Sequence, residues 1–298
     1  MSDDAWAFHL PNLRSTFLPD LDHAFVEGDL ARADAQVIAW EANAHELKRQ
    51  LSADIDIHSA NADMLYAHVW EGRRLRRVRD LNPRDMHSNG MSYRDCAKRW
   101  VHATNFAGKA RTVASVMVCP TPHVEACQRW WLEERHPEIG ALHRKIDYEL
   151  RSRKNPVIHN RFGFRRGYVG GDRQSNLIGQ ALAWIAQSTV AIVINTALRQ
   201  LDPDSLTGIL DCDDFPSWGR RDLAVPEFDY LLQVHDSILG QVRLDALDDT
   251  LIRRIDDALA VVVPYDDPLV IAREIKWSSR SWGDMTKWKH GETRTEAA

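Results

Sequence analysis

Two aspartates that follow apolar runs are the residues with the clearest chemical potential. Asp29 follows the run at 23–28, which predicts a short strand, and Asp236 lies in the turn between two strands predicted within 228–243. Magnesium prefers carboxylate oxygens, so two such groups on rigid strands can hold two divalent ions about 4 Å apart, as nucleotidyl transfer requires. Aspartates at strand ends are also common surface residues, and the pattern alone favours that interpretation.

A regular spacing between residues 94 and 106 predicts a second group of chemically useful side chains. Arg94, Lys98, His102 and Phe106 recur every four residues, which places them on one face of a helix. The two cations could grip a triphosphate, and the two rings could stack on a base. An amphipathic helix with a mixed face explains the spacing equally well, so both interpretations stay open.

Cysteine and histidine spacing offers a zinc site as a further candidate. Cys119, His123 and Cys127 recur every four residues, and His136 could be a fourth ligand. Because the spacing matches no strong zinc-finger pattern, these side chains are better interpreted as bystanders.

The composition is that of an ordinary folded protein. The 298 residues are 44% hydrophobic and 27% charged, which argues against wholesale disorder and allows one large domain or two packed ones. The net charge of −5 argues against a simple nucleic-acid coat protein, so nucleic-acid binding would depend on local patches of Arg and Lys. Scattered cysteines and an N-terminus without a signal-peptide pattern predict an intracellular, cytoplasmic protein.

Apolar periodicity predicts mostly helices around a few strands. The predicted helices cover about 31–51, 56–66, 91–116, 124–153, 174–201 and 245–260, and a final strand covers 268–277. The basic segment 71–86 is interpreted as a solvated helix face or as a surface for nucleic-acid phosphates. The apolar stretch Leu177–Ile194 is interrupted by polar residues, which favours a buried helix over a membrane span.

Six segments, in chain order, resemble motifs of the family A DNA polymerases. They are DLARADAQVIA (29–39), DIHSANA (56–62), the stripe from Arg94 to Phe106, FGFRR (162–166), AQSTVA (186–191) and QVHDS (233–237). The first is similar to the family's Asp-Tyr-Ser-Gln-Ile-Glu-Leu-Arg, and the last to its Gln-Val-His-Asp-Glu. Order and spacing agree over about residues 12–284, up to Trp282 after a final strand.

The resemblance implies a catalytic site with two metal ions. Asp29 and Asp236 would bind two Mg²⁺ ions, or Mn²⁺, with the backbone carbonyl of Leu30 as a further ligand. Lys98 would be catalytic as the proton donor to the departing pyrophosphate. Phosphoryl transfer of this kind depends on positioning and charge neutralisation.

The resemblance also assigns residues to the substrates. Those implied to bind the incoming nucleotide are Arg94, Lys98, His102, Phe106, His58, Asp34 and Arg32. Those implied to contact the primer or template are His235, Gln187 and Arg165. The expected partners are therefore a DNA primer–template and deoxynucleoside triphosphates, with no membrane.

Several positions depart from the family pattern. Asp34 stands in place of a glutamate that excludes the ribose 2′ hydroxyl, and Phe106 in place of a tyrosine, which puts sugar discrimination in doubt. Ser237 replaces the acid after the second metal aspartate, so the site has two carboxylates instead of three. Arg32 and Ala107 stand where the family has glutamine and glycine.

The fold that the resemblance implies is α+β, a right-hand polymerase lacking its thumb. Residues 1–66 and 155–298 would form an antiparallel palm sheet with its helices, and 67–154 a helical fingers subdomain. The first motif begins close to residue 1, so we expect a second polypeptide to supply the thumb and early palm. Such a split polymerase would be a phage or viral form, at work in the host cytoplasm.

Template-directed DNA synthesis at a primer 3′ end is the function that the resemblance implies. A single-subunit RNA polymerase-like enzyme is one alternative, because those enzymes carry the run His-Asp-Ser found at 235–237. A non-catalytic polymerase remnant that binds nucleic acid is another, although the intact Asp29, Asp236, Arg94 and Lys98 argue against it.

Overall fold

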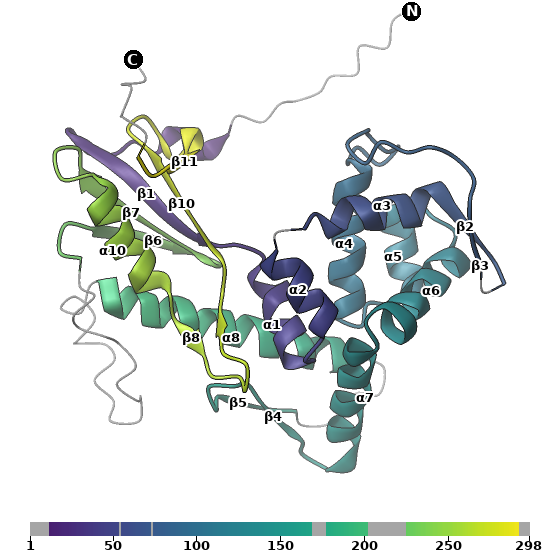
Figure 1. Ribbon diagram of the computed structural model, residues 1–298. Coiled ribbons are helices and arrows are strands. Elements are labelled where there is room, and N and C mark those ends of the chain that lie inside the picture. The colour runs from purple at the N-terminus through teal and green to yellow at the C-terminus, as the bar shows by residue number, and fades with distance from the viewer. Residues whose placement is uncertain (1–11, 54, 73, 169–176, 202–224, 292–298) are drawn as a thin grey trace, which may run out of the picture. The chain divides into compact units, whose positions relative to one another are not determined.

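Two compact units make up the chain in the computed structural model (Figure 1), which describes residues 12–53, 55–72, 74–168, 177–201 and 225–291. The first unit, called here the sheet unit, takes its residues from Met1–Ala31, Ala191–Val262 and Val270–Ala298. The second, the helical unit, takes them from Arg32–Val190 and Val263–Leu269.

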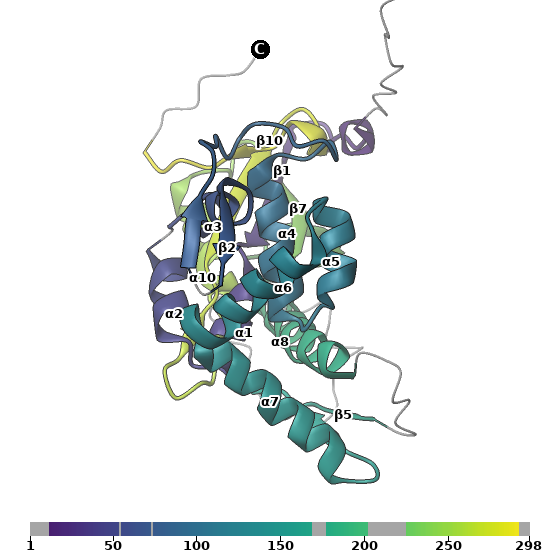
Figure 2. The ribbon, with the colours of Figure 1, turned by 90° about the vertical axis from the view of Figure 1, so that its right-hand side faces the viewer.

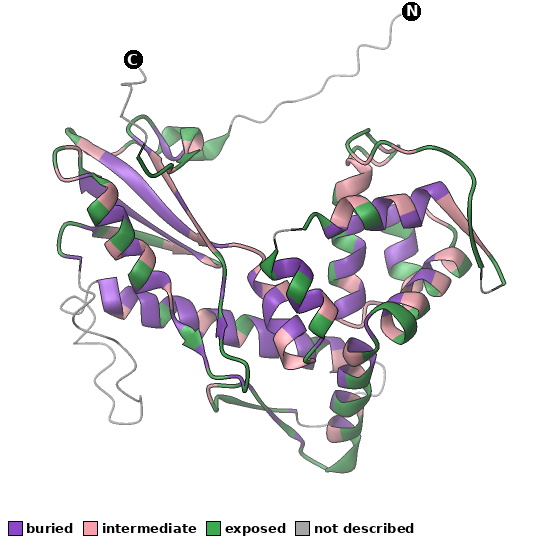
Figure 3. Ribbon diagram, viewed as in Figure 1, coloured by how far each residue is buried: buried purple, intermediate pink, exposed green. Residues whose placement is uncertain are grey.

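The sheet unit is built on five antiparallel strands in the order β11-β10-β1-β7-β6. Their bounds are His23–Leu30 (β1), Asp229–Val234 (β6), Ser237–Arg243 (β7), Arg273–Ser278 (β10) and Thr286–Lys287 (β11). Figure 3 shows that β1 and β7, two of the three inner strands, are mostly buried. The central strand β1 is therefore hydrogen-bonded to a neighbouring strand on each side, β10 and β7.

One face of β1 packs against helix α10, Asp249–Leu259. Gly28 permits this approach, because a Cβ atom there would lie 2.3 Å from Cδ1 of Leu259. The helix starts at Asp248, whose carboxylate accepts a hydrogen bond of 2.8 Å from the N–H of Leu251, as a helix N-cap does. Alternation along the strand then places Glu27 and Asp29 on the opposite face.

Seven helices carry the helical unit: α1 (Ala33–Glu41), α2 (His45–Ser52), α3 (Ile57–Ala67), α4 (Tyr93–Asn105), α5 (Ala110–Met117), α6 (Thr121–Trp130) and α7 (Pro137–Ser152). Helix α3 packs on α4, and α5 packs on α6 (Figure 2). Trp100 and Trp131 are fully buried at the centre of this unit, with their rings 5.5 Å apart and close to perpendicular.

Short strands and one long helix complete the fold. The strand pairs are β2–β3 (His68–Glu71 and Arg74–Arg77), β4–β5 (Val157–His159 and Arg165–Gly167) and β8–β9 (Val262–Val263 and Leu269–Val270). Helix α8, Leu177–Leu201, contributes residues to both units. It is the one helix among the described residues that is long and apolar enough to cross a membrane, and 56% of its apolar window is buried. A buried core helix, as predicted from the sequence, passes the same test.

The prediction of an α+β fold with an antiparallel sheet is confirmed, but three predicted helices are wrong in extent. The helix predicted over 31–51 is broken at Asn43, whose backbone is left-handed with φ of 52°. The helix predicted over 91–116 is broken at Ala107, with φ of 53°. A five-residue π-helical turn, η2 (Trp131–Arg135), separates α6 from α7 within the helix predicted over 124–153.

The basic segment 71–86 is also not a helix. Its first part forms the β2–β3 hairpin, in which Gly72 takes a left-handed conformation with φ of 63°. The palm and fingers boundaries proposed at 66/67 and 154/155 stay a prediction.

Candidate active site

A two-residue turn brings the second aspartate next to the first. Strands β6 and β7 form a hairpin in which Val234 pairs with Ser237, and His235 adopts a left-handed backbone with φ of 59°. Ser237 in turn pairs with Asp29 across the β1–β7 ladder. The N–H of Leu30 donates to the carbonyl of Asp236 at 3.0 Å. Backbone pairing thus places Asp29 and Asp236 at neighbouring positions on adjacent strands, at one end of the sheet.

Strand β10 adds two charged side chains to the same face. Glu274 pairs directly with Asp29. The ammonium of Lys276 lies 3.2 Å from Oδ2 of Asp29 and 3.4 Å from Oε2 of Glu274. Burial alone would lower the pKa of Lys276, but the carboxylates of Asp29 and Glu274 raise it, so the side chain is cationic at neutral pH. Sequence analysis missed both residues, because their relevance depends on the β1–β10 register.

A buried glutamate lies beneath this group. Glu27 is 4% exposed, and its Oε1 accepts hydrogen bonds of 3.3 Å from the hydroxyl of Ser237 and from the indole N–H of Trp282. Ser237, which stands where the family has a third acid, therefore donates its hydroxyl to Glu27, the acid two residues before Asp29. Glu27 was also missed in the sequence, where it is one charged residue in an apolar strand.

The donor set suits a hard divalent cation. Asp29, Asp236 and the carbonyl of Leu30 offer oxygen atoms, the ligands that Mg²⁺ and Mn²⁺ prefer, from two paired strands. Within the described part of the chain, no group of three or more His, Cys, Asp or Glu side chains is arranged to hold a metal ion. Metal binding through the two carboxylates of Asp29 and Asp236 therefore stays a prediction.

The zinc alternative finds no support in the structure. The thiol of Cys127 accepts a hydrogen bond of 3.3 Å from the Trp70 indole, and Nε2 of His123 lies 2.8 Å from the carbonyl oxygen of Leu65. Burial raises the pKa of Cys119 to about 11 and that of Cys127 to about 12, so both thiols stay protonated. These side chains are the bystanders that the sequence favoured.

A group of cations lies at the start of helices α3 and α4. Asp56 caps α3 by accepting from the N–H groups of His58 and Ser59, and the guanidinium of Arg94 donates to both of its oxygens at 2.9 and 3.2 Å. Lys98 lies one helical turn further along α4 and is exposed. The carboxylate of Asp56 therefore fixes the first residue of the predicted stripe.

The neutral imidazole of His58 lies in the field of these cations. Burial lowers the pKa of His58 to about 4, and the positive charges of Arg94, Lys98 and Arg32 add to the effect. Its Nδ1 is buried and has no hydrogen-bond partner in the described structure. Four of the residues assigned to the incoming nucleotide are thus gathered in one place, here called the cationic cluster: Arg32, His58, Arg94 and Lys98.

The end of the predicted stripe differs from expectation. Phe106 is the C-cap residue of α4 and not part of the helix. The chain turns at Ala107, whose backbone is left-handed. Gly108 then passes close to the end of the helix, since a Cβ atom there would lie 2.8 Å from the carbonyl oxygen of Ala103. Its ring still lies 4.6 Å from that of His102, so the two form an aromatic pair. Asp34 is half-buried in the first turn of α1.

The residues assigned to primer and template are exposed on three different elements. Gln187 lies on α8, Arg165 on β5 and His235 in the β6–β7 turn next to Asp236. The carboxylate pair belongs to the sheet unit and the cationic cluster to the helical unit, so the prediction that they face one shared substrate stays a prediction.

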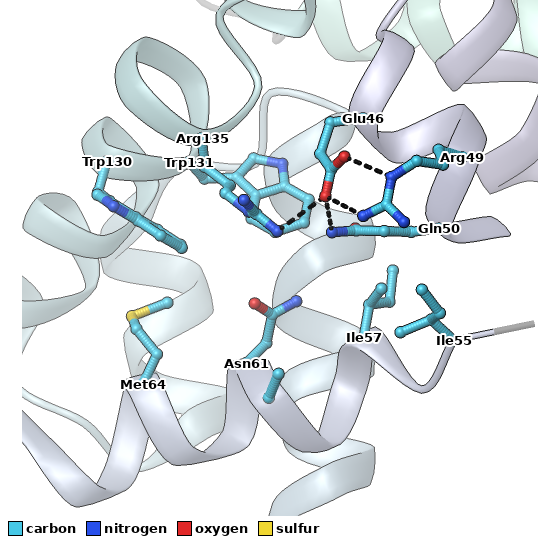
Figure 4. A pocket seen from close by; sticks show the side chains of 11 residues that line it. Glu46, Arg49, Gln50, Ile55, Ile57, Asn61, Met64, Trp130, Trp131 and Arg135 are labelled. Atoms are coloured by element: carbon cyan, nitrogen blue, oxygen red, sulfur yellow. Dashed lines mark hydrogen bonds and ion pairs between the residues drawn. The ribbon is translucent and has the colours of Figure 1, made fainter. Parts of the chain in front are cut away.

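A pocket of about 420 Å³ in the helical unit contains none of the predicted site residues (Figure 4). Its apolar wall includes Met64 and Trp130. On its polar wall, Glu46 accepts from Arg49, Gln50 and Arg135 (Figure 4). The hydrogen bond from Arg49 lowers the pKa of Glu46 to about 2. Glu46, Arg49, Gln50 and Arg135 thus satisfy one another, whereas Nδ2 of Asn61, which also lines the pocket, is buried without a hydrogen-bond partner in the described part of the chain.

Comparison with known proteins gives a match of fold. No protein-family model and no curated protein sequence matches the chain. Among solved structures, it is similar to one described as the POL domain of Pol1 from M. smegmatis in complex with DNA primer-template and dNTP, with a TM-score of 0.64 and 15% identity. The match covers 89% of this chain and 41% of that one. The chain thus has a fold similar to part of that POL domain, and it spans less than half the length of the chain that it matches.

Proposed function

We propose that this chain catalyses template-directed DNA synthesis, adding deoxynucleotides to a primer 3′ end. The observation that carries the proposal is the pairing of Asp29 with Ser237 and the hydrogen bond from the N–H of Leu30 to the carbonyl of Asp236, which make two aspartates from distant parts of the chain neighbours along the backbone. The fold match to a polymerase domain solved with primer-template and dNTP supports the same reading. Nucleotidyl transfer is the chemistry that two such carboxylates serve best.

Each group of side chains has a distinct task in this proposal. Asp29, Asp236 and the Leu30 carbonyl hold the divalent ions, which when bound supply Lewis-acid activation of the primer hydroxyl and of the triphosphate. Arg94 and Lys98 bind the triphosphate, and the Lys98 ammonium gives a proton to the departing pyrophosphate. His102 and Phe106 stack against the nucleotide, and His235, Gln187 and Arg165 contact the primer or template.

Primer extension with defined variants tests the proposal. The chain is incubated with a labelled primer–template, deoxynucleotides and Mg²⁺ or Mn²⁺, beside Asp29→Asn, Asp236→Asn and the surface control Asp245→Asn. We expect each site variant to fall below about a thousandth of the wild-type rate, because a metal ligand is lost while the strand pairing remains. Asp245 is exposed and bound to Arg243, so its variant should keep full activity. Extension that survives Asp236→Asn would refute the proposal.

An RNA polymerase-like enzyme is the second candidate; two positions favour it, whereas the segment DIHSANA at 56–62 and the acid retained at Asp34 argue against it. Asp34 is one methylene shorter than the family's glutamate, and Ser237 completes the run His-Asp-Ser. Competition between deoxy- and ribonucleotides in the same assay decides the matter. Preferential incorporation of ribonucleotides would favour the second candidate.

We also propose that a second polypeptide supplies the thumb and early palm and that the enzyme works in the cytoplasm, the host cytoplasm for a phage protein. Isolation of the protein with its bound chains from the native source tests this, and purification without any partner would argue against it.

A further inference from the structure

Lys276 is bound to one of the two proposed metal ligands. Asp29 pairs with Glu274 and Glu27 pairs with Lys276 across the β1–β10 ladder, so Lys276 is the diagonal neighbour of Asp29 on the same face. Its ammonium lies 3.2 Å from Oδ2 of Asp29. Both side chains are about 70% shielded from solvent, with exposed fractions of 28% and 31%. The contact is therefore fixed by the strand register and partly protected from screening by salt.

An ammonium and a divalent cation compete for the same carboxylate oxygens. Asp29 and Asp236 carry two negative charges, and Lys276 cancels one of them in the structure as it stands. Ser237, where the family has an acid, adds no charge of its own, and its hydroxyl binds the buried Glu27. Because the ammonium of Lys276 occupies Oδ2 of Asp29, a divalent ion that binds there must displace the lysine or share the oxygen with it.

A second partner is already in place for the displaced lysine. Oε2 of Glu274 lies 3.4 Å from the Lys276 ammonium, and Oε1 of the same glutamate lies 3.0 Å from that of Lys287. A small rotation of the Lys276 side chain would move its charge from Asp29 to Glu274. The arrangement therefore has two positions for one cation, one on the metal ligand and one beside it.

We propose that Lys276 is a built-in competitor for the metal at Asp29, neutralising this carboxylate in the metal-free protein and moving to Glu274 when a divalent cation binds. This inference rests on the proposed function, since it takes Asp29 as a metal ligand. Lys276 is then a positioning residue that sets how much metal the site needs. The predicted signature is a metal affinity that rises when the lysine is removed.

Direct binding of Mn²⁺ to the full chain tests this without an activity assay. Free Mn²⁺ is measured by its paramagnetic resonance signal for wild type, Lys276→Met and the matched control Lys287→Met. We expect Lys276→Met to bind Mn²⁺ about tenfold more tightly, because the competing charge is gone. Lys287→Met removes a lysine charge that contacts Glu274 but not Asp29, so its gain in Mn²⁺ affinity should be clearly smaller than that of Lys276→Met. Lys276→Gln, which keeps a hydrogen-bond donor for Asp29, should repeat the gain if the methionine variant fails to fold.

A double-mutant cycle with Glu274→Gln tests the second position of the lysine. In the wild-type background this change confines Lys276 to Asp29, so we expect Mn²⁺ to bind about threefold more weakly. In the Lys276→Met background the same change should have less than half that effect on the free energy of binding. Equal effects in both backgrounds would mean that Glu274 does not receive the lysine, and would overturn that part of the proposal.

Failure of this inference can be told from failure of the proposed function. The competitor role alone is refuted by three results together. The wild-type protein extends primers, Asp29→Asn abolishes Mn²⁺ binding, and neither Lys276→Met nor Lys276→Gln raises the affinity for Mn²⁺. Mn²⁺ binding that is unaffected by Asp29→Asn, together with no primer extension, refutes the metal site and with it both proposals. A loss of affinity in Lys276→Met would also overturn the inference, since it would make the lysine a support for the metal.

Discussion

The carboxylate pair and the cationic cluster are held in place by different parts of the chain. Asp29 and Asp236 owe their proximity to backbone pairing between β1 and β7, which no side-chain substitution at the site removes. Arg94 and His58 instead depend on one carboxylate, that of Asp56, which caps α3 and binds the guanidinium of Arg94. Substitutions should therefore change the chemistry of the first region and the geometry of the second.

After the loss of the metal ligands, the largest expected effect separates the two regions by function. Lys98→Ala should lower the rate of nucleotide incorporation by about a hundredfold or more, because the proposed proton donor and triphosphate ligand is lost. Lys98 is exposed, so the stability of the protein should not change. Single-turnover incorporation measures the effect, with Arg99→Ala, its exposed neighbour, as the control.

Mn²⁺ binding to Lys98→Ala sharpens this comparison. If the two regions are positioned independently, the affinity of the carboxylate pair for Mn²⁺ should match that of wild type. A large change in affinity would break the distinction between them.

The next effect tests what supports the carboxylate pair. Glu27→Ala should lower the free energy of unfolding by about 2–3 kcal/mol, because the Ser237 hydroxyl and the Trp282 indole N–H both lose their buried acceptor. Glu27→Gln keeps an acceptor oxygen and should cost clearly less. Urea denaturation measures both variants, and equal losses would mean that the charge of Glu27 matters more than its hydrogen bonds.

How much could be predicted from the sequence differs between the same two regions. The strand before Asp29 and the hairpin around Asp236 follow from apolar runs and a turn, and both are found where predicted. Lys276, Glu274 and Glu27 could not be assigned, because their meaning comes from which residue faces which across three strands. A register between distant strands is a tertiary property that local periodicity does not contain.

In the helical unit, the sequence predicted the helices but not their breaks. Asn43 and Ala107 take left-handed backbone conformations that cost a non-glycine residue free energy, and tertiary packing imposes them against local propensity. The basic segment after Glu71 was interpreted from its charge alone, although Gly72 was a usable turn signal for the β2–β3 hairpin. The helix predicted over 56–66 is found as α3, and its N-cap Asp56 is the residue on which the cationic cluster depends.

A smaller effect tests the dependence of that cluster on Asp56. Asp56→Ala should lower the free energy of unfolding by about 1–2 kcal/mol, since α3 loses its N-cap and Arg94 its partner. Burial alone would raise the pKa of Asp56, but hydrogen bonds from Arg94 and Ser59 lower it well below its usual value. The stability that the ionised Asp56 carboxylate contributes is therefore fully present above about pH 4 and is lost as the pH falls below that value.

Urea denaturation at pH 7 and at pH 3 measures the Asp56 effect, with Asp80→Ala, a fully exposed acid, as the control. The gap between wild type and Asp56→Ala should narrow at the lower pH. A gap that stays constant would mean that capping by the neutral acid suffices.

The smallest expected effect is the pH dependence contributed by His58. Its folded-state pKa is lowered to about 4, whereas an unfolded histidine titrates near 6.5, so the unfolded chain binds the extra proton first. Stability from the neutral imidazole is present above about pH 6.5 and declines as the pH falls from 6.5 toward 4. Allowing for the part of the ring that solvent reaches, we expect a loss of about 1–2 kcal/mol over this window.

Burial also lowers the pKa of His136 to about 4, so the stability that the neutral His136 contributes declines over the same pH range. The contribution of His58 is therefore isolated by difference. Subtracting the pH profile of His58→Gln from that of wild type removes the His136 term, and the remaining slope between pH 4 and 6.5 belongs to His58. The sign follows from two causes: burial first, and then the positive charges of Arg94, Lys98 and Arg32, disfavour a proton on His58, so stability must fall on acidification. A difference profile that is flat or rises on acidification would show that neither burial nor these cations act on the imidazole, and the electrostatic description of the cluster would then be wrong.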